Sequence, residues 1–378
     1  MPWNTRDVMS LRQEFVLLAS QEGANVAELC RRFGISRSTA YVLLKRVTLE
    51  GGAGLIDRSR RPTTSPSQTP ADVEQAVVNL RQQHPAWGGR KISASLRAAG
   101  LTHVPHPSTV TSILRRHGLI EDPPVPRQQH WQRFEHDQPN ELWQIDFKGH
   151  FETPAGRCYP LTLLDDHSRY SLLLSACPRY DTQTVQSRLE GVFRKYGMPV
   201  RINADNGAPW GSSSMPEHGI TALTIWLIRL GIVVSHSRPA HPQTNGKLER
   251  FHRSMQAEVI GGRSWGDLQQ VQHAFDRWQS IYNQHRPHEA LGLTMPIERY
   301  RPSPRTYPTT LAAIEYGPDD VVETVKWNGQ VRLKGKQLRV SNALTNLPIA
   351  FRPRRDQDGL YDMYFCHQKF GSVDLSQL

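Results

Sequence analysis

The segment Leu142–Phe147 (LWQIDF) alternates apolar and polar side chains, which predicts a β-strand with one face toward a core. Two further strands are expected at 158–165 and 170–175, joined by a turn at 166–169. Helix then alternates with strand, with helices expected at 181–196, 219–230, 245–260 and 266–284 and strands at 200–204 and 232–235. This order predicts a mixed α/β domain over residues 140–305.

Two short helices are expected in residues 1–50, before this domain. Asn25 is a suitable N-cap for a helix over 26–33, and Gly34 breaks the chain before a second helix over 36–46. This arrangement is typical of a helix-turn-helix DNA-binding domain, although two amphipathic helices of a bundle would look similar. The second helix can present polar side chains to a major groove, namely Arg37, Ser38, Thr39 and Tyr41.

A basic linker follows at 51–70, rich in Gly, Pro, Ser and Thr. Arg58, Arg60 and Arg61 are candidates for contacts with phosphates or a minor groove, and a solvated hinge is the alternative. Residues 71–120 predict a second helix-turn-helix domain, in which Ser108 is expected to cap the last helix after Pro107. Its candidate DNA contacts are Thr109, Arg115 and Arg116. Residues 121–139 read as a connector.

Residues 306–378 predict a small β-barrel-like domain. Asn-Gly at 328–329 lies between alternating segments, which predicts a hairpin. One face of that hairpin is expected to gather the apolar side chains Val325, Trp327, Val331 and Leu333. The other face is expected to carry Lys326, Gln330, Arg332 and Lys334. The weaker candidates for DNA contacts in this tail are Lys326, Arg332, Lys334 and Lys336.

The net charge of +11 favours a polyanionic partner. Residues 1–138 contain 18 lysines and arginines against 12 acids, so the excess leans toward the predicted DNA-binding domains. The four cysteines form no Cys-x-x-Cys pair, which argues against a disulfide framework and a structural zinc site. No apolar run is long enough to span a bilayer and the first residues do not form a signal peptide, so we expect a cytoplasmic, nucleoid-associated protein without a membrane partner.

Three carboxylates stand in unusual settings: Asp146 in the first strand, Asp205 directly after the strand at 200–204, and Glu249 early in a helix. Carboxylates that converge need a cation, and Mg²⁺ or Mn²⁺ suits oxygen ligands and leaves positions for phosphate and water. Two such ions can activate a nucleophile and stabilise a leaving oxygen in phosphoryl transfer. These three acids are therefore the candidate catalytic and metal-binding residues.

Other charged residues near these acids have weaker signals. Asp165 and Asp166 are expected to belong to a turn, and Glu258 lies more than two helical turns beyond Glu249. His252 is expected to be structural or to face phosphate. Three cations flank Glu249 and are expected to hold phosphates, with a solvated basic face as the alternative: Lys247, Arg250 and Arg253.

Four segments resemble bacterial insertion-sequence transposases with a retroviral-integrase-like core: WQID at 143–146, ADNG at 204–207, HSRPAHPQTNGKLERFH at 236–252 and YNQHRPHEAL at 282–291. The third is the most specific, and the resemblance spans most of the chain. It implies an RNase H-like core with an Asp-Asp-Glu triad at Asp146, Asp205 and Glu249. Glu249 lies 44 positions after Asp205, more than in many integrases, and residues 210–219 are the expected insertion, as a surface loop.

The resemblance also implies the reaction and its partners. A transposase nicks the ends of a mobile element and joins the freed 3′-hydroxyl to target DNA, here with Mg²⁺ or Mn²⁺ and two ions expected in each site. The expected partners are double-stranded DNA, as terminal inverted repeats and target, and a homodimer or higher homo-oligomer that brings two ends together. A metal-dependent nuclease without strand transfer and a non-catalytic DNA-binding regulator remain alternatives. No setting for the nucleophile of a serine or tyrosine recombinase stands out.

Overall fold

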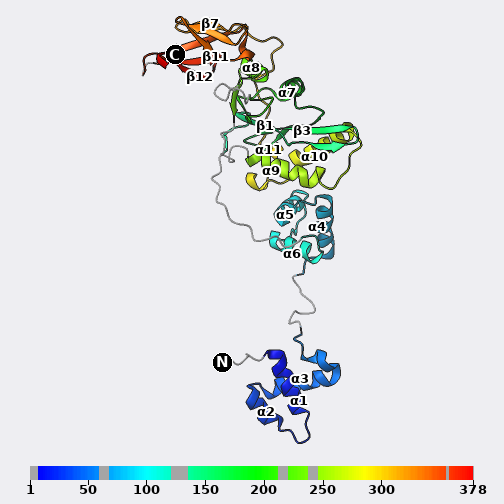
Figure 1. Cartoon of the computed structure of the whole chain (residues 1–378). Coiled ribbons are helices and arrows are strands. Elements are labelled where there is room, and N and C mark those ends of the chain that lie inside the picture. Colours follow the sequence, from blue (N-terminus) through cyan, green and yellow to red (C-terminus); the bar gives the residue numbers. More distant parts are fainter. Residues whose placement is uncertain are drawn as a thin grey trace. The chain divides into compact units, whose positions relative to one another are not determined.

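A computed structural model describes residues 7–58, 68–120, 135–211, 220–236, 246–354 and 357–377 (Figure 1). The chain divides into two compact units, Met1–Gln68 and Thr69–Leu378. Within the described ranges, no helix has the length and apolar character needed to cross a membrane.

The first unit is a small helical bundle. Its elements are α1 (Val8–Ala19), α2 (Val26–Phe33), α3 (Arg37–Glu50) and the 3₁₀-helix η1 (Gly51–Leu55). The Asn25 side chain accepts from two backbone N–H groups of α2, as predicted, and Gly34 takes the left-handed conformation that glycine adopts without strain. Ser36 caps α3 through Thr39 N–H. The core contains Phe15, Cys30, Ala40, Leu43 and Leu55.

The second unit begins with another three-helix domain: α4 (Ala71–Gln83), α5 (Gly89–Ala98) and α6 (Pro107–Arg116). A side chain at Gly89 would collide with the backbone oxygen of Pro107, so glycine allows α5 and α6 to approach closely. The prediction of Ser108 as the N-cap of α6 is wrong. Pro107 already occupies the first turn, and His106 Nδ1 accepts from Ser108 N–H instead.

A mixed sheet forms the centre of this unit. Its strands are β1 (Leu142–Phe147), β2 (Phe151–Thr153), β3 (Gly156–Asp165), β4 (Ser171–Cys177), β5 (Arg201–Ala204) and β6 (Val233–His236). The strand order is β2-β3-β1-β5-β6, with β4 pairing with β3. β1 is antiparallel to β3 and parallel to β5, and β5 is parallel to β6. The predicted mixed α/β core is therefore confirmed.

Helices cover both faces of this sheet (Figure 1). They are α7 (Thr182–Tyr196), α8 (Ala222–Arg229), α9 (Gly246–Met255), η2 (Gln256–Ile260, a π-helix), α10 (Leu268–Gln284), η3 (Glu289–Leu291) and α11 (Pro296–Arg299). Trp143 and Ile145 of β1 pack in one cluster with α7 and α8, whereas Leu164 and Leu174 pack in another with α9 and α10. Because side chains alternate along a strand, Gln144 and Asp146 lie on the face of β1 that α9 covers.

The C-terminal part is a small β domain. Its elements are β7 (Val321–Thr324), β8 (Gln330–Leu333), β9 (Lys336–Arg339), η4 (Asn342–Leu344), β10 (Pro348–Pro353), β11 (Leu360–Phe365), β12 (Gln368–Asp374) and η5 (Leu375–Gln377). The expected barrel is not closed, because β12-β11-β10-β7 form one open sheet and β8-β9 a separate hairpin.

The two segments on either side of Asn328-Gly329 were predicted to pair with each other as a hairpin, and this prediction is wrong. These residues form a tight turn closed by Lys326 N–H on Gln330 O, but the strand before it pairs with β10 and the hairpin turns later, at Lys334-Gly335. Val325, Val331 and Leu333 are buried as expected, whereas Trp327 is 84% exposed. Trp327 therefore belongs to the turn and not to the apolar face.

Candidate active site

Asp146 and Asp205 lie near the ends of neighbouring parallel strands. Gln144 of β1 pairs with Asn203 of β5, and each aspartate follows two residues later on its own chain segment. Ile202 and Ala204 pack in the cluster with α7 and α8, so the alternation of side chains directs Asn203 and Asp205 to the opposite face. Both aspartates thus lie on the side of the sheet that α9 covers, and both are half-buried.

Both carboxyl groups are harder to ionise than in water. Burial, together with the charge of Asp205, raises the pKa of Asp146 to about 7, against a small opposing effect of the Phe147 N–H. Burial also raises the pKa of Asp205, although its carboxylate accepts from Gly207 N–H at 3.1 Å. Among the described residues, no ion pair neutralises either group. Two such carboxyl groups favour the binding of a cation, because its positive charge offsets the repulsion between the two carboxylates.

α9, which carries Glu249, is joined to the strand of Asp146 through Thr162 and His252. Thr162 Oγ1 donates to the carbonyl oxygen of Asp146 at 2.9 Å and accepts from His252 Nε2 at 2.8 Å, which assigns the ring proton to Nε2. His252 is buried enough that its pKa falls to about 4, with Lys148 adding to the effect, so the ring is neutral at pH 7. Glu249 lies one helical turn before His252 on the same side of α9.

Glu249 itself is exposed, in the first turn of α9. Within the parts of the chain that the structure describes, no three His, Cys, Asp or Glu side chains converge closely enough to hold a metal ion. Residues 237–245, which precede α9, lie outside those parts. The third ligand therefore stays a prediction, while Asp146 and Asp205 form the pair that the fold brings together.

Asp165 and Asp166 have complete sets of partners and differ from the first pair in this respect. Asp165 accepts from Asn140 N–H at 2.7 Å and from the N–H and hydroxyl of Ser168 at 2.8 and 2.6 Å. Asp166 accepts from Gln144 Nε2 at 2.8 Å and pairs with Lys247. These aspartates are structural, as the turn at 166–169 suggested, and Lys247 already contacts a carboxylate.

The predicted DNA contacts of the helix-turn-helix units lie on exposed first turns or helix ends. The exposed side chains are Arg37, Ser38, Thr39, Tyr41, Thr109, Arg115 and Arg116. Two arginines have acidic neighbours in the same unit: Arg58 pairs with Glu50, and Arg116 pairs with Glu74 at 2.7 Å. Arg60 and Arg61 lie outside the described residues. Arg250 and Arg253 are exposed on α9, beside Glu249.

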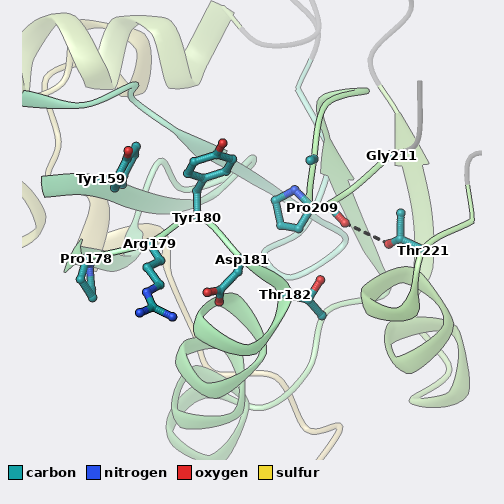
Figure 2. Close-up of a pocket in the computed structure, with 10 residues that line it drawn as sticks. Tyr159, Pro178, Arg179, Tyr180, Asp181, Thr182, Pro209, Gly211 and Thr221 are labelled. Atoms are coloured by element: carbon teal, nitrogen blue, oxygen red, sulfur yellow. Dashed lines mark hydrogen bonds between the residues drawn. The ribbon is translucent and has the colours of Figure 1, made fainter. Parts of the chain in front are cut away.

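One feature of the site has no counterpart in the sequence predictions. A cleft of about 630 Å³ lies between the loop that joins β4 to α7 and the loop that follows Asp205, and its lining includes Tyr159, Tyr180 and Pro209 (Figure 2). Arg179-Tyr180-Asp181 lies between β4, which ends at Cys177, and α7, which begins at Thr182. The position of Tyr180 just after a strand could have suggested a site at the edge of the sheet. The other aromatic residue that lines the cleft, Tyr159, comes from another strand, so the sequence did not reveal the cleft.

Known protein families match most of the chain. Integrase core domain families match residues 136–242 and 230–296, and the C-terminal domain of the IS481 family transposases matches 320–377. A helix-turn-helix domain family matches 11–63, and a homeodomain-like domain family matches 39–114. These matches assign DNA-binding domains to the N-terminal part and an integrase-type core to the sheet.

Curated relatives agree with these families. An uncharacterized 31.7 kDa protein of insertion element IS407 from Burkholderia multivorans is 24% identical over 290 residues, which are 74% of this chain and 92% of the relative. Transposase InsD for insertion element IS2-9 from Escherichia coli is also 24% identical, over 79% of this chain and 95% of the relative.

Among solved structures, an integrase catalytic core domain of HTLV-2 in complex with magnesium covers 43% of this chain and 97% of its own, at 16% identity and a TM-score of 0.32. A simian T-cell lymphotropic virus intasome in complex with a PP2A regulatory subunit covers 78% and 95%, at 16% identity and a TM-score of 0.39. The integrase core families, the transposase C-terminal domain and the insertion-element relatives together support a DDE transposase with an integrase-type core, preceded by DNA-binding helix-turn-helix domains.

Proposed function

We propose that Asp146, Asp205 and Glu249 are the catalytic carboxylates with which this transposase cuts and joins the terminal inverted repeats of its element. The observation that carries the assignment is the Asp146–Asp205 pair, which lies on one sheet face without an ion pair among the described residues. The α9 contact through His252 and Thr162 supports Glu249 as the third member.

The donor set fits a divalent cation of the Mg²⁺ or Mn²⁺ kind, because its oxygens are those such ions prefer and the raised pKa of Asp146 would be relieved by positive charge. When bound, such ions, two in each site in our proposal, activate a nucleophilic oxygen and stabilise the leaving one. Asp146 and Asp205 hold that charge in place on rigid strand ends, and Glu249 completes the set from α9.

The chemistry needs no covalent protein intermediate. Water first displaces the 3′-oxygen of the element strand from its phosphate, and that 3′-hydroxyl then displaces a 3′-oxygen of target DNA. Each step breaks one P–O bond and forms another, so no external energy source is required. The task of the protein is to align the attacking and leaving oxygens and to stabilise negative charge.

DNA is positioned by several parts of the chain in this proposal. Side chains at the start of α3 and along α6 read or contact the inverted repeats, and Arg58 with Arg60 and Arg61 adds phosphate contacts from the linker. Arg250 and Arg253 hold phosphates beside Glu249. Lys247 adds positive charge next to Glu249, although its ammonium already pairs with Asp166, which competes with a phosphate for it.

Two element ends must meet in one complex before they are joined to one target. We therefore propose a homodimer or higher homo-oligomer assembled on DNA, acting at the bacterial nucleoid.

A strand-transfer assay tests the function. The full chain is incubated with labelled duplexes whose ends come from the DNA flanking its gene, with Mg²⁺, Mn²⁺ or EDTA, beside the variants Asp205→Asn and Glu152→Gln. Glu152 is a matched control, because it is an exposed acid of the same sheet that pairs only with Arg157 among the described residues.

We expect joined products with either metal, none with EDTA, loss in Asp205→Asn and retention in Glu152→Gln. Cut ends without joined products would instead support a metal-dependent nuclease. Binding without chemistry would support a DNA-binding regulator. Equal loss in both variants would remove the argument for Asp205.

A further inference from the structure

The cleft beside the acids has two walls that come from different parts of the chain. One wall is the loop between β4 and α7, with Arg179 and Tyr180, and the other contains Pro209 and Thr221 (Figure 2). The Thr221 hydroxyl donates to the Pro209 carbonyl at 3.0 Å, which fastens that wall to the start of α8. At about 630 Å³ the cleft is roomier than the lower end of small-ligand sites, roughly 300 Å³.

Tyr180 contributes an accessible aromatic ring to the lining of this cleft. Its ring is 5.1 Å from the ring of Tyr159 and 6.5 Å from that of Phe147, between centroids. The residue is nevertheless 52% exposed, so the aromatic cluster supports the ring without burying it. A large, supported and accessible aromatic surface is suited to stacking with another planar group.

Chain neighbours of both aspartates lie at the cleft. Phe147 directly follows Asp146 in β1 and contacts Tyr180 at its edge. On the other side, Pro209 lies four residues after Asp205 in the same loop. Trp210 N–H donates to Gly207 O at 3.0 Å, which holds this loop in a tight turn. A DNA strand whose phosphate lies at the aspartates therefore has a neighbouring nucleotide within reach of the cleft.

The charges around the cleft favour a nucleotide over a purely apolar occupant. Arg179 is exposed at the rim, where a guanidinium suits a phosphate. The Asp181 carboxylate, also at the rim, accepts from Thr184 N–H at 2.8 Å and caps α7. Asp181 repels a phosphate at the helix end, so the phosphate contact falls to Arg179 and the base to Tyr180.

We propose that this cleft binds one unpaired nucleotide of the DNA next to the reacting phosphate, with its base stacked on Tyr180 and its phosphate near Arg179. A base inside a duplex is already stacked on both faces, so only an unpaired or extruded base offers a free face to the tyrosine. The proposal rests on the proposed function, because it places the reacting phosphate at Asp146 and Asp205.

Binding of the full chain to element-end duplexes tests the proposal without any catalytic step. One series of duplexes carries a single unpaired adenine at successive positions across the end, and a matched series has an abasic nucleotide at the same positions. All measurements are made in EDTA, so that a chain with no transposition activity still reports on the cleft.

At the best position, we expect the unpaired base to tighten binding about 5- to 150-fold over the abasic duplex, the range for stacking one base on an aromatic side chain. Tyr180→Ala removes this difference and Tyr180→Phe retains it. Trp327→Ala is the matched control, since it removes another exposed aromatic ring and leaves the difference intact. Arg179→Gln weakens binding of both series by a similar factor.

Equal affinity for the base and abasic series at every position overturns the proposal, as does a difference that survives Tyr180→Ala. Tyr180 is half exposed, so its loss should leave the fold intact, and the Tyr180→Phe variant checks this point. Failure of the proposed function has a different signature, since the strand-transfer assay would then fail while the base-dependent binding remained.

Discussion

Two pairs of aspartates lie at the sheet, and they differ in how far the protein itself compensates their negative charge. Asp165 and Asp166 are almost fully buried, yet they accept hydrogen bonds from backbone, serine and glutamine donors, and Lys247 neutralises one of them. Asp146 and Asp205 are only half-buried, yet burial raises the pKa of both carboxyl groups, and the charge of Asp205 raises that of Asp146 further. Burial alone would therefore single out Asp165 and Asp166, which is the wrong pair for function.

The difference lies in where the compensating charge comes from. For Asp166 the protein supplies the cation itself, so the interaction contributes to folding. For Asp146 and Asp205 the described residues supply no ion pair, and only the charge of His236 favours the ionised form of Asp205, so most of the compensation is left to something that binds. A site that is electrostatically incomplete in the free protein is a common sign of function, because stability has been given up for binding.

The largest contrast is expected in activity. Asp146→Asn should lower strand transfer by about 10³-fold or more, since weakening a metal site removes several kcal/mol of transition-state stabilisation. Glu152→Gln should change activity little, because that exposed acid already pairs with Arg157. Product formation on a labelled element end measures both variants at equal protein concentration, after circular dichroism has shown that both are folded. A fully active Asp146→Asn chain would remove the distinction between the two pairs.

The next contrast is expected in stability. Asp166→Asn should lower the free energy of unfolding by about 2–4 kcal/mol, because it removes the carboxylate that compensates the largely buried Lys247 ammonium. The cost stays below that of a fully buried charge, since burial already lowers the pKa of Lys247 and the amine can lose its proton. Urea unfolding followed by tryptophan fluorescence measures the change.

A double variant sharpens this prediction. Asp166→Asn with Lys247→Met removes both charges, so it should recover most of the loss. If Asp166→Asn alone unfolds no more readily than the wild-type chain, the pair does not have the structural role assigned to it.

The sequence predicted the positions of the acids better than their roles. The placement of Asp146 in a strand and Asp205 after one followed from local patterns, and parallel pairing of β1 with β5 brings them together. By contrast, the partner of Asp166 is Lys247, which lies 81 positions away in the chain. No local pattern reveals such a pairing, so Lys247 was expected to hold phosphate and its bond to Asp166 was missed.

Turn chemistry was predicted less well than the elements that the turns join. Asn328-Gly329 does turn the chain, but tertiary pairing of β7 with β10 prevents the flanking residues from forming one hairpin. Trp327 is exposed for the same reason. The aromatic cleft was missed because Tyr159, Tyr180 and Pro209 come from three separate segments. The cleft and the Lys247–Asp166 pair were missed because each depends on side chains from distant segments.

A third contrast concerns pH. The pKa of Asp146 is about 7 in the folded chain against 3.8 as the ordinary value, so its contribution to stability is fully present below about pH 4 and is lost as pH rises through 7. In EDTA, Asp146→Asn should therefore be more stable than the wild-type chain at pH 8, by about 1–3 kcal/mol after allowance for solvent screening. The advantage should shrink toward pH 5.

Urea unfolding of both chains between pH 5 and 8 measures this difference. Asp181→Asn is a control of opposite sign, because hydrogen bonds from Thr184 hold the pKa of Asp181 below its ordinary value and the variant loses a helix cap. An advantage of Asp146→Asn that does not vary with pH would mean that some effect other than charge causes it.

The smallest contrast is expected in metal-linked stability. At a metal concentration ten times its dissociation constant, Mn²⁺ or Mg²⁺ should stabilise the wild-type chain by about 1.4 kcal/mol, because the ion binds only the folded site. For a unit of about 300 residues this corresponds to a rise of roughly 2–4 °C in Tm at pH 8. Asp166→Asn has a lower starting Tm but keeps the same rise, since its charge balance does not involve the ion. Asp146→Asn loses the rise. Thermal melts with and without EDTA measure all three chains, and a rise that disappears in Asp166→Asn but persists in Asp146→Asn would reverse the roles assigned to the two pairs.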